Sequence, residues 1–251
     1  MAEPILKVEN LEAGYGEVQV LWGISLGVEA GQLTTIIGAN GAGKTTTLRA
    51  SMGIINPKAG RIILKGEDVT RWPPHAKADR GMVLVPEGRQ LFANMTVRDN
   101  CTVGACFGRE NLSLGQAREV ADEVIEFLGL ADRRDLLAAH LTIAGKKRLE
   151  VARALCARPM LLLLDEVLAG LNPFEIDQMI DIVRQIRDRG VSILIIEHLM
   201  QAIMSLSDRI VVLNFGEKLA EGRPQEVAND PVVVEAYLGD PDMAKKLERK
   251  R

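Results

Sequence analysis

The sequence predicts an α/β protein with a largely parallel β-sheet, on three observations. Short apolar runs bounded by Gly, Pro or charged residues recur along the 251 residues and are typical of buried strands. Helical patterns separate several of these runs, and alternation of strands with helices builds a parallel sheet. From about Arg89 to Ala157 the strand-like runs vanish and helical patterns replace them, which indicates a helical insertion in the α/β core.

Seven apolar runs are the predicted strands: ILKVENL, LTTIIG, RIILKG, GMVLVP, LLLLD, VSILIIE and RIVVLN. The clearest predicted helix follows Asn172, because apolar residues repeat there at spacings of three and four and share one face. These residues are Ile176, Met179, Ile180, Val183 and Ile186. Asn172 suits the N-cap, Pro173 the first helical position, and Gly190 lies just past the end. Two more helices, QAREVADEVIEFLGL and KKRLEVARALCA, fall in the insertion.

Composition restricts the class of protein. With 47% hydrophobic residues and 31 Lys+Arg against 34 Asp+Glu, the chain can bury a full core, and its net charge of −3 disfavours nucleic-acid binding through a dominant basic face. Three cysteines suggest neither a disulfide framework nor a metal site. No apolar run approaches the roughly 20 residues that cross a bilayer, and the N-terminus lacks a signal-peptide pattern, so we expect a soluble protein of a reducing compartment.

A glycine-rich motif follows the second predicted strand. The segment GANGAGKTT fits G-x-x-x-x-G-K-[ST] and precedes a predicted helix, TTLRASM. Glycines let backbone N–H groups turn toward a phosphate, and the helix N-terminus adds its positive dipole. Lys44 is expected to reach the β- and γ-phosphates, and the Thr45 hydroxyl to bind Mg²⁺. The predicted nucleotide-binding residues of this loop are Gly38, Asn40, Gly41, Ala42, Gly43, Lys44, Thr45 and Thr46.

Other polar residues close two further strands. In LLLLDE, Asp165 is expected to help hold Mg²⁺ and Glu166 to activate the attacking water. His198 follows ILIIE at the carboxyl edge of the sheet, where ligands bind, and would donate to the γ-phosphate as a catalytic residue. A structural loop histidine is the alternative for His198, and that ordinary interpretation is kept for His75 and His140.

These elements, in this order, resemble the ATP-binding subunit of an ABC transporter over essentially the whole chain. VPEGRQLFANMTV resembles the Q-loop segment and AGLNP the D-loop, and the C-terminal segment from Ile195 to Gly239 is similar to ATPases of branched-chain amino acid importers. The resemblance implies that Tyr15 stacks on adenine, a core position being the alternative. It also implies a P-loop NTPase (RecA-like) core with an antiparallel edge and an inserted α-helical subdomain, the ABC ATPase fold. The implied domain is 1–240, with a core of 1–88 and 158–240, a helical subdomain of about 89–157 and a basic tail at 241–251.

The resemblance also implies the activity and the partners. Hydrolysis of Mg-ATP would drive import of a small solute, a branched-chain or similar amino acid, through two transmembrane permease subunits. A second ATPase subunit, expected to be a different chain, would complete the dimer. The protein would lie in the cytoplasm on the inner face of the cell membrane, with no nucleic-acid partner and no membrane contact except through its partners.

Three departures from the family pattern stand out. Glu87 takes the place of the usual Gln and would lie near Mg²⁺ as an additional negative ligand, and Val167 replaces a Pro. The signature LSGGQ, which binds ATP of the opposite subunit in this family, aligns with Leu141 to Gly145. Thr142 keeps a hydroxyl, Ala144 replaces a glycine and Gly145 replaces the Gln. If Ala144 needed a positive φ, the cost would be about 1–2 kcal/mol; a register shifted by one residue is the alternative alignment.

Two other functions remain open at this point. A soluble regulatory or nucleic-acid-associated ABC ATPase would have no membrane partner, and a nucleotide-dependent binding protein would not hydrolyse ATP usefully. A single cassette with a short insertion disfavours the first, and Glu166 disfavours the second.

Overall fold

The computed structural model describes residues 4–88, 90–110 and 112–238. The chain forms two compact units, of which the first combines Met1–Trp72 with Ser192–Arg251 and the second is Pro73–Val191. The second unit therefore groups two strands and a long helix with the helical insertion. The predicted division at 89–157 follows the change from strands to helices and stays a prediction, and the predicted tail at 241–251 lies outside the described residues.

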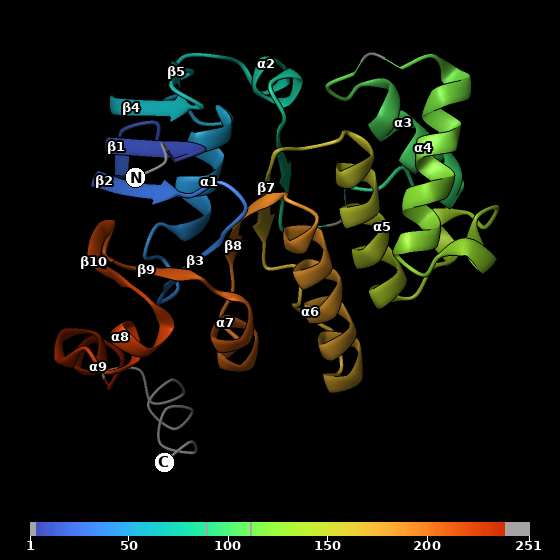
Figure 1. The fold of residues 1–251 in the computed structure, drawn as a ribbon. Coiled ribbons are helices and arrows are strands. Elements are labelled where there is room, and N and C mark those ends of the chain that lie inside the picture. The colour runs from blue at the N-terminus through green and yellow to red at the C-terminus, as the bar shows by residue number, and fades with distance from the viewer. Residues whose placement is uncertain (1–3, 89, 111, 239–251) are drawn as a thin grey trace. The chain divides into compact units, whose positions relative to one another are not determined.

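The first unit holds two groups of strands (Figure 1). One is an antiparallel sheet in the order β2-β1-β4-β5, and the other runs β10-β9-β3-β8, where β3 pairs in parallel with both neighbours. The antiparallel sheet consists of β1 (Leu6–Tyr15), β2 (Val18–Val28), β4 (Ala59–Leu64) and β5 (Glu67–Asp68). The other group consists of β3 (Leu33–Gly38), β8 (Ser192–Ile196), β9 (Arg209–Asn214) and β10 (Glu217–Gly222).

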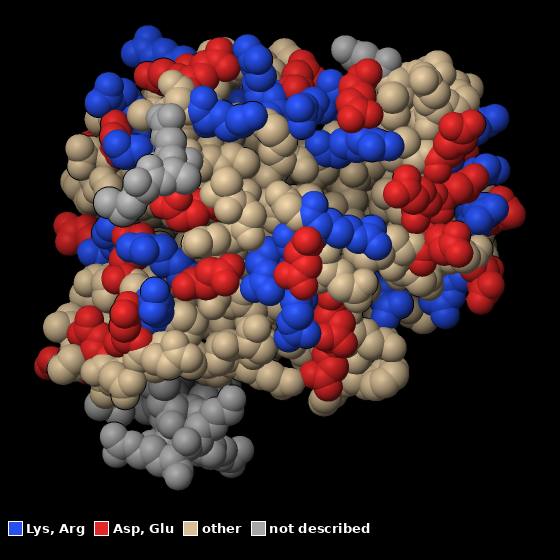
Figure 2. Space-filling model, viewed as in Figure 1, with Lys and Arg blue, Asp and Glu red and all other residues tan. Residues whose placement is uncertain are grey.

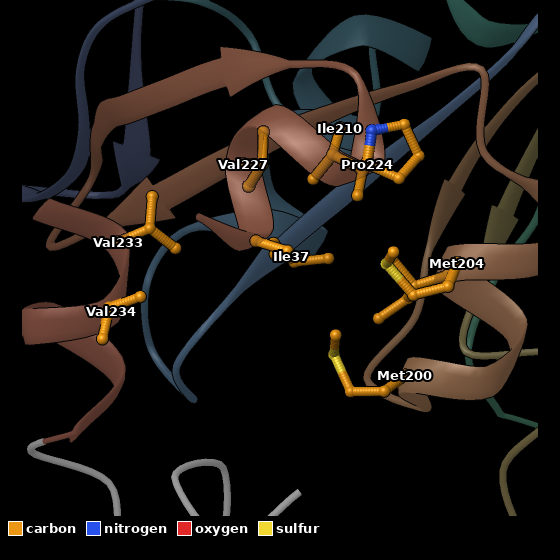
Figure 3. Close-up of a pocket in the computed structure, with 10 residues that line it drawn as sticks. Ile37, Met200, Met204, Ile210, Pro224, Val227, Val233 and Val234 are labelled. Carbon is orange, nitrogen blue, oxygen red and sulfur yellow. The ribbon is translucent and has the colours of Figure 1, made fainter. Parts of the chain in front are cut away.

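Four helices complete the first unit: α1 (Lys44–Met52), α7 (Met200–Leu206), α8 (Pro224–Ala228) and α9 (Pro231–Leu238). Ile37 of β3 and Ile210 of β9 pack with Ile203 of α7 and Val227 of α8 in an apolar cluster. Figure 3 shows the small cavity there, of about 30 Å³, between the methionines of α7 and the valines of α8 and α9. Because its lining is apolar, the cavity offers a water molecule too few hydrogen-bond partners.

The second unit contains two parallel strands, β6 (Met82–Val85) and β7 (Leu161–Asp165). Its helices are α2 (Pro74–Asp79), α3 (Val97–Cys106), α4 (Leu114–Phe127), α5 (Ile143–Cys156) and α6 (Pro173–Asp188), with short 3₁₀ turns at Ala131–Arg133 and Ala138–His140. Helices α3, α4 and α5 pack on one another (Figure 1). The contact between α3 and α5 requires a glycine, since a Cβ on Gly104 would lie 2.2 Å from the Arg153 carbonyl oxygen.

Each of the seven apolar runs forms a strand, and the helix after Asn172 is α6. Its Asn172 side chain accepts from the Glu175 N–H at 3.0 Å, and the Glu175 carboxylate accepts from the Asn172 N–H at 3.0 Å. This reciprocal arrangement is a capping box that satisfies two backbone donors at the start of the helix.

We expect Asn172→Ala to lower the free energy of unfolding by about 0.5–2 kcal/mol, because the substitution removes the acceptor at the N-cap. Urea denaturation followed by circular dichroism measures the change. Asn172→Asp is the matched control, since Asp caps a helix as well as Asn does. Equal losses of stability in both variants would contradict the capping explanation.

Candidate nucleotide-binding site

The glycine-rich loop lies between β3 and α1 in the first unit. Gly38 closes β3, and a Cβ at this position would lie 2.4 Å from the Leu213 carbonyl oxygen of the neighbouring strand β9. Gly43 has a φ of 99°, and a Cβ there would lie 2.6 Å from Cδ2 of Leu21. Both positions therefore accept only glycine without a shift of the backbone or of Leu21.

The loop is open at its tip and closed at its base. Residues 39–41 are exposed, whereas Ala42, Lys44 and Thr46 are buried and Thr45 is half-buried. The Lys44 ammonium folds back over the loop and donates to the carbonyl oxygens of Gly38 at 2.9 Å and Ala39 at 3.1 Å. The first turn of α1 carries no acidic residue, so the positive end of the helix dipole stays available to a phosphate.

The turn between β9 and β10 supports this loop, which the sequence did not reveal. The Gly216 N–H donates to the Ala42 carbonyl at 3.1 Å, and the Trp22 N–H donates to the Gly216 carbonyl at 2.8 Å. A Cβ on Gly216 would lie 2.0 Å from the Val20 carbonyl oxygen. The only signal in the sequence is a glycine in NFGE, which marks a turn and does not identify what packs against it.

His198 leaves the sheet at the same edge as the glycine-rich loop. Strand β8 pairs in parallel with β3, with Ile36 opposite Ile196. The carboxyl ends of these two strands therefore lie at the same edge of the sheet. His198 lies two residues beyond Ile196 and is half-buried. This placement fits the predicted contact with a γ-phosphate, which stays a prediction.

Tyr15 is the last residue of β1 and is 47% exposed, so the alternative of a core position is wrong. The Arg49 guanidinium of α1 donates to the Tyr15 hydroxyl at 3.3 Å. This hydrogen bond links the ring to the helix that begins at Lys44. Stacking of the exposed ring on adenine stays a prediction.

In the second unit, two adjacent acids close β7. Asp165 is buried, with 1% of its surface exposed, while Glu166 is half-buried and has a φ of 51°. The left-handed backbone ends the strand and turns the chain at Glu166. For a residue other than glycine this conformation costs about 1–2 kcal/mol, and such strained residues cluster at functional sites. The Lys147 ammonium of α5 donates to the Glu166 carbonyl at 3.2 Å.

Glu87 lies in the loop after β6 and is exposed. Because β6 and β7 run in parallel with Val85 opposite Leu164, Glu87 follows β6 at the edge where Asp165 and Glu166 close β7. The guanidinium of Arg153 holds this loop: it donates to the Gln90 carbonyl at 2.6 Å and lies 5.5 Å from the centre of the Phe92 ring. Burial lowers the pKa of Arg153.

The altered signature forms the start of α5. Thr142 is the N-cap, and its hydroxyl accepts from the Gly145 N–H at 3.2 Å. Ala144 lies in the first helical turn and is absent from the described residues with positive φ, so the cost considered for a left-handed alanine does not arise. Helix α5 begins at Ile143, directly after its N-cap Thr142, so Ala144 has helical backbone angles. Binding of a nucleotide by Thr142, Ala144 and Gly145 stays a prediction.

The described part of the chain contains neither a cluster of metal-binding side chains nor a helix that could span a membrane. The described residues contain no group of three His, Cys, Asp or Glu side chains placed to hold a metal ion, and Cys101 and Cys156 are buried. A hydrogen bond with Cys101 and burial raise the pKa of the Cys156 thiol. No helix in residues 4–88, 90–110 and 112–238 is long and apolar enough to span a bilayer.

Comparison with known proteins identifies the family. Residues 21–169, more than half of the chain, match the ABC transporter family. The chain belongs to the ABC transporter ATP-binding family. Members of this family hydrolyse ATP, so the chain is an ATPase, and the predicted ABC ATPase fold is confirmed. ATPase subunits of ABC transporters work with membrane permease partners and dimerise.

Relatives with two different transport roles are similar to this ABC ATPase. The high-affinity branched-chain amino acid transport ATP-binding protein BraF of Pseudomonas aeruginosa is 36% identical, covering 96% of this chain and 100% of BraF. The lipopolysaccharide export ATP-binding protein LptB of Haemophilus influenzae is 35% identical over 94% of this chain and 98% of LptB. Residues 217–242 also match the branched-chain amino acid ATP-binding cassette transporter family.

The solved structures agree with the fold. A nucleotide-free ATP-binding cassette from an ABC transporter has a TM-score of 0.85 and 30% identity, covering 95% of this chain and 100% of that structure. A cassette in its ADP conformation has a TM-score of 0.84 and 30% identity, and the match covers 95% of this chain and 100% of that structure.

Proposed function

We propose that this ABC ATPase drives import of a branched-chain or similar amino acid. The observation that carries the proposal is the match of residues 217–242 to the branched-chain amino acid transporter family, which lies outside the segment shared by ABC ATPases in general. The similarity to BraF supports it, whereas the comparable similarity to LptB makes an exporter the alternative.

Each candidate residue has one proposed role in the chemistry. Lys44 and the surrounding loop bind the β- and γ-phosphates, and Tyr15 stacks on adenine. Glu166 takes a proton from the attacking water, and His198 donates a hydrogen bond to the γ-phosphate. Hydroxyl and carboxylate oxygens suit Mg²⁺, so Thr45, Asp165 and Glu87 would hold this ion, whose charge neutralises the phosphates.

The second unit offers a surface for the permease subunits. Val85, Phe92 and Phe107 line an open cleft of about 480 Å³, and the two phenylalanine side chains are 48% and 79% exposed. Exposed aromatic residues of this kind mark protein interfaces. The ATPase would thus attach to the inner face of the cell membrane through two permease subunits.

Copurification tests the partners and the class together. Tagged Glu166→Gln protein, expressed at its native level, is purified from solubilised membranes with Mg-ATP, and stoichiometric companions are identified by mass spectrometry. Two multi-span proteins and an amino-acid-binding protein encoded beside them would support the importer. Companions that bind lipopolysaccharide would favour the exporter, and recovery from the soluble fraction alone would favour a regulatory ATPase.

An asymmetric dimer follows from the altered signature. In the proposed heterodimer, ATP on this chain's loop meets the partner's complete signature, while ATP on the partner's loop meets Thr142, Ala144 and Gly145. We expect substitution of Lys44 to remove most ATP hydrolysis and substitution of the partner's phosphate-loop lysine to leave most of it. Phosphate release by the reconstituted transporter measures both. Equal losses in the two variants, or a homodimer, would overturn the asymmetry.

A further inference from the structure

An open cleft in the second unit has no place in the proposed ATPase mechanism. It has a volume of about 340 Å³ and lies among α4, the end of α5 and the end of α6. This size is within the roughly 300–1,000 Å³ of small-molecule pockets. None of its lining residues belongs to the glycine-rich loop, the acids after β7, the Q-loop segment or the signature.

The floor of the cleft is apolar. Val120 and Phe127 come from α4, Leu155 from α5 and Ile186 from α6. Val120 and Ile186 are buried, whereas Phe127 and Leu155 are half-buried and keep apolar surface in contact with solvent. An aliphatic side chain of a ligand would cover this surface, which is favourable by about 25 cal/mol per Å² of apolar area.

Charged groups of both signs lie above this floor. The Arg189 guanidinium carbon lies 3.7 Å from the centre of the Phe127 ring, and this cation–π contact favours a guanidinium held beside the cleft. Glu123 stands one helical turn before Phe127 on α4 and lines the same cleft. Arg158 is already paired with Glu110, with 3.3 Å between Nε and Oε2. Within the described residues, neither Arg189 nor Glu123 has an ion-pair partner.

We propose that this cleft binds a free amino acid with an aliphatic side chain. Arg189 binds its carboxylate through two parallel N–H donors and Glu123 accepts from its ammonium group. The side chain covers Leu155 and the part of Phe127 that Arg189 leaves exposed. A zwitterion contacts both charged groups, whereas a simple anion contacts Arg189 alone and a simple cation contacts Glu123 alone. Both groups are exposed, so water solvates the one that the ligand does not reach. The site is additional to the nucleotide-binding residues and does not depend on which solute is transported.

Calorimetric titration of the full chain with L-leucine tests the site. We expect saturable binding that Arg189→Gln and Glu123→Gln each weaken about 10- to 100-fold, the equivalent of one hydrogen bond to a charged group. The matched controls are Arg184→Gln on α6 and Glu119→Gln on α4, neither of which lines the cleft. Both controls are expected to bind L-leucine as the unmodified chain does, and melting temperatures verify that all variants fold.

Two analogues of leucine separate a zwitterion site from a simpler one. 4-Methylpentanoate lacks the ammonium group and 3-methylbutylamine lacks the carboxylate, so each should bind about 10-fold more weakly than L-leucine or worse. Binding of 4-methylpentanoate as tight as that of L-leucine would overturn the proposal in favour of an anion site. No saturable binding at about 10 mM L-leucine, or equal weakening in the control variants, would overturn it as well. Because the titration needs no permease, its failure would leave the proposed transport function untouched.

Discussion

Replacing Glu166 with Gln is expected to lower ATP hydrolysis by about 10²- to 10⁴-fold while ATP binding persists. Gln keeps the size of the side chain and its acceptor oxygen, but it cannot take a proton from water. Release of inorganic phosphate measures hydrolysis, and equilibrium titration with ATP measures binding. Glu126→Gln, an exposed change on α4, is the control and should retain full activity. Unchanged hydrolysis in Glu166→Gln would exclude Glu166 as the general base.

A glycine variant can separate the two roles of Glu166, the left-handed turn of its backbone and the proton transfer by its carboxylate. Glycine adopts a φ of 51° without the strain that Glu bears, so Glu166→Gly should keep the melting temperature of the unmodified protein. The same variant lacks the carboxylate and should be as inactive as Glu166→Gln. A stable but inactive glycine variant would show that the turn at the end of β7 tolerates the loss of the side chain and that hydrolysis does not.

The glycine-rich loop and the acidic end of β7 could be located from the sequence because each is one continuous segment. Gly38 to Thr46 form one continuous loop, and Asp165 and Glu166 follow one apolar run. The tertiary support of the loop could not be predicted, since Gly216 lies far from Ala42 in the sequence and the pairing is between two backbones. The contact of Arg189 with Phe127 was hidden for a similar reason, because it joins the residue after α6 to the end of α4 through side chains alone.

The strands show where the apolar pattern fails as a signal. Strands β3, β7 and β8 are almost entirely buried. Strands β7 and β8 contain the continuous apolar runs LLLL and ILII, and β3 differs only by the two buried threonines at 34 and 35. Strand β10 was not predicted because three of the six residues in EKLAEG are charged. Among the described residues, it is also an edge strand that pairs with β9 alone. Strand β2 contains glycines at 23 and 27, and register shifts in its pairing with β1 break the alternation of buried and exposed residues.

The two signs of charge are mixed on one face of the protein (Figure 2), as the nearly equal numbers of basic and acidic residues allow. On the face shown in Figure 2, Lys and Arg are interspersed with Asp and Glu over the described residues, and neither sign covers the face. A net charge of −3 cannot distinguish such a mixture from two segregated patches of opposite sign. The function therefore depends on individual charged groups. Among them, Lys44 has the largest expected effect on ATP binding.

Replacing Lys44 with Ala is expected to weaken ATP binding by about 10- to 100-fold, which corresponds to the loss of a hydrogen bond between charged groups. The Lys44 ammonium donates to the Gly38 and Ala39 carbonyl oxygens, and a phosphate must offer it a stronger acceptor than these two carbonyls.

Two further ligands make the prediction for Lys44 specific. AMP has no β- or γ-phosphate, so its affinity should change little in Lys44→Ala, whereas ADP and ATP should both lose affinity. Lys58→Ala removes an exposed lysine of the same unit and should bind all three nucleotides normally. If AMP lost affinity to the same extent as ATP, the substitution would have damaged the loop as a whole, and the assignment of Lys44 to the terminal phosphates would be wrong.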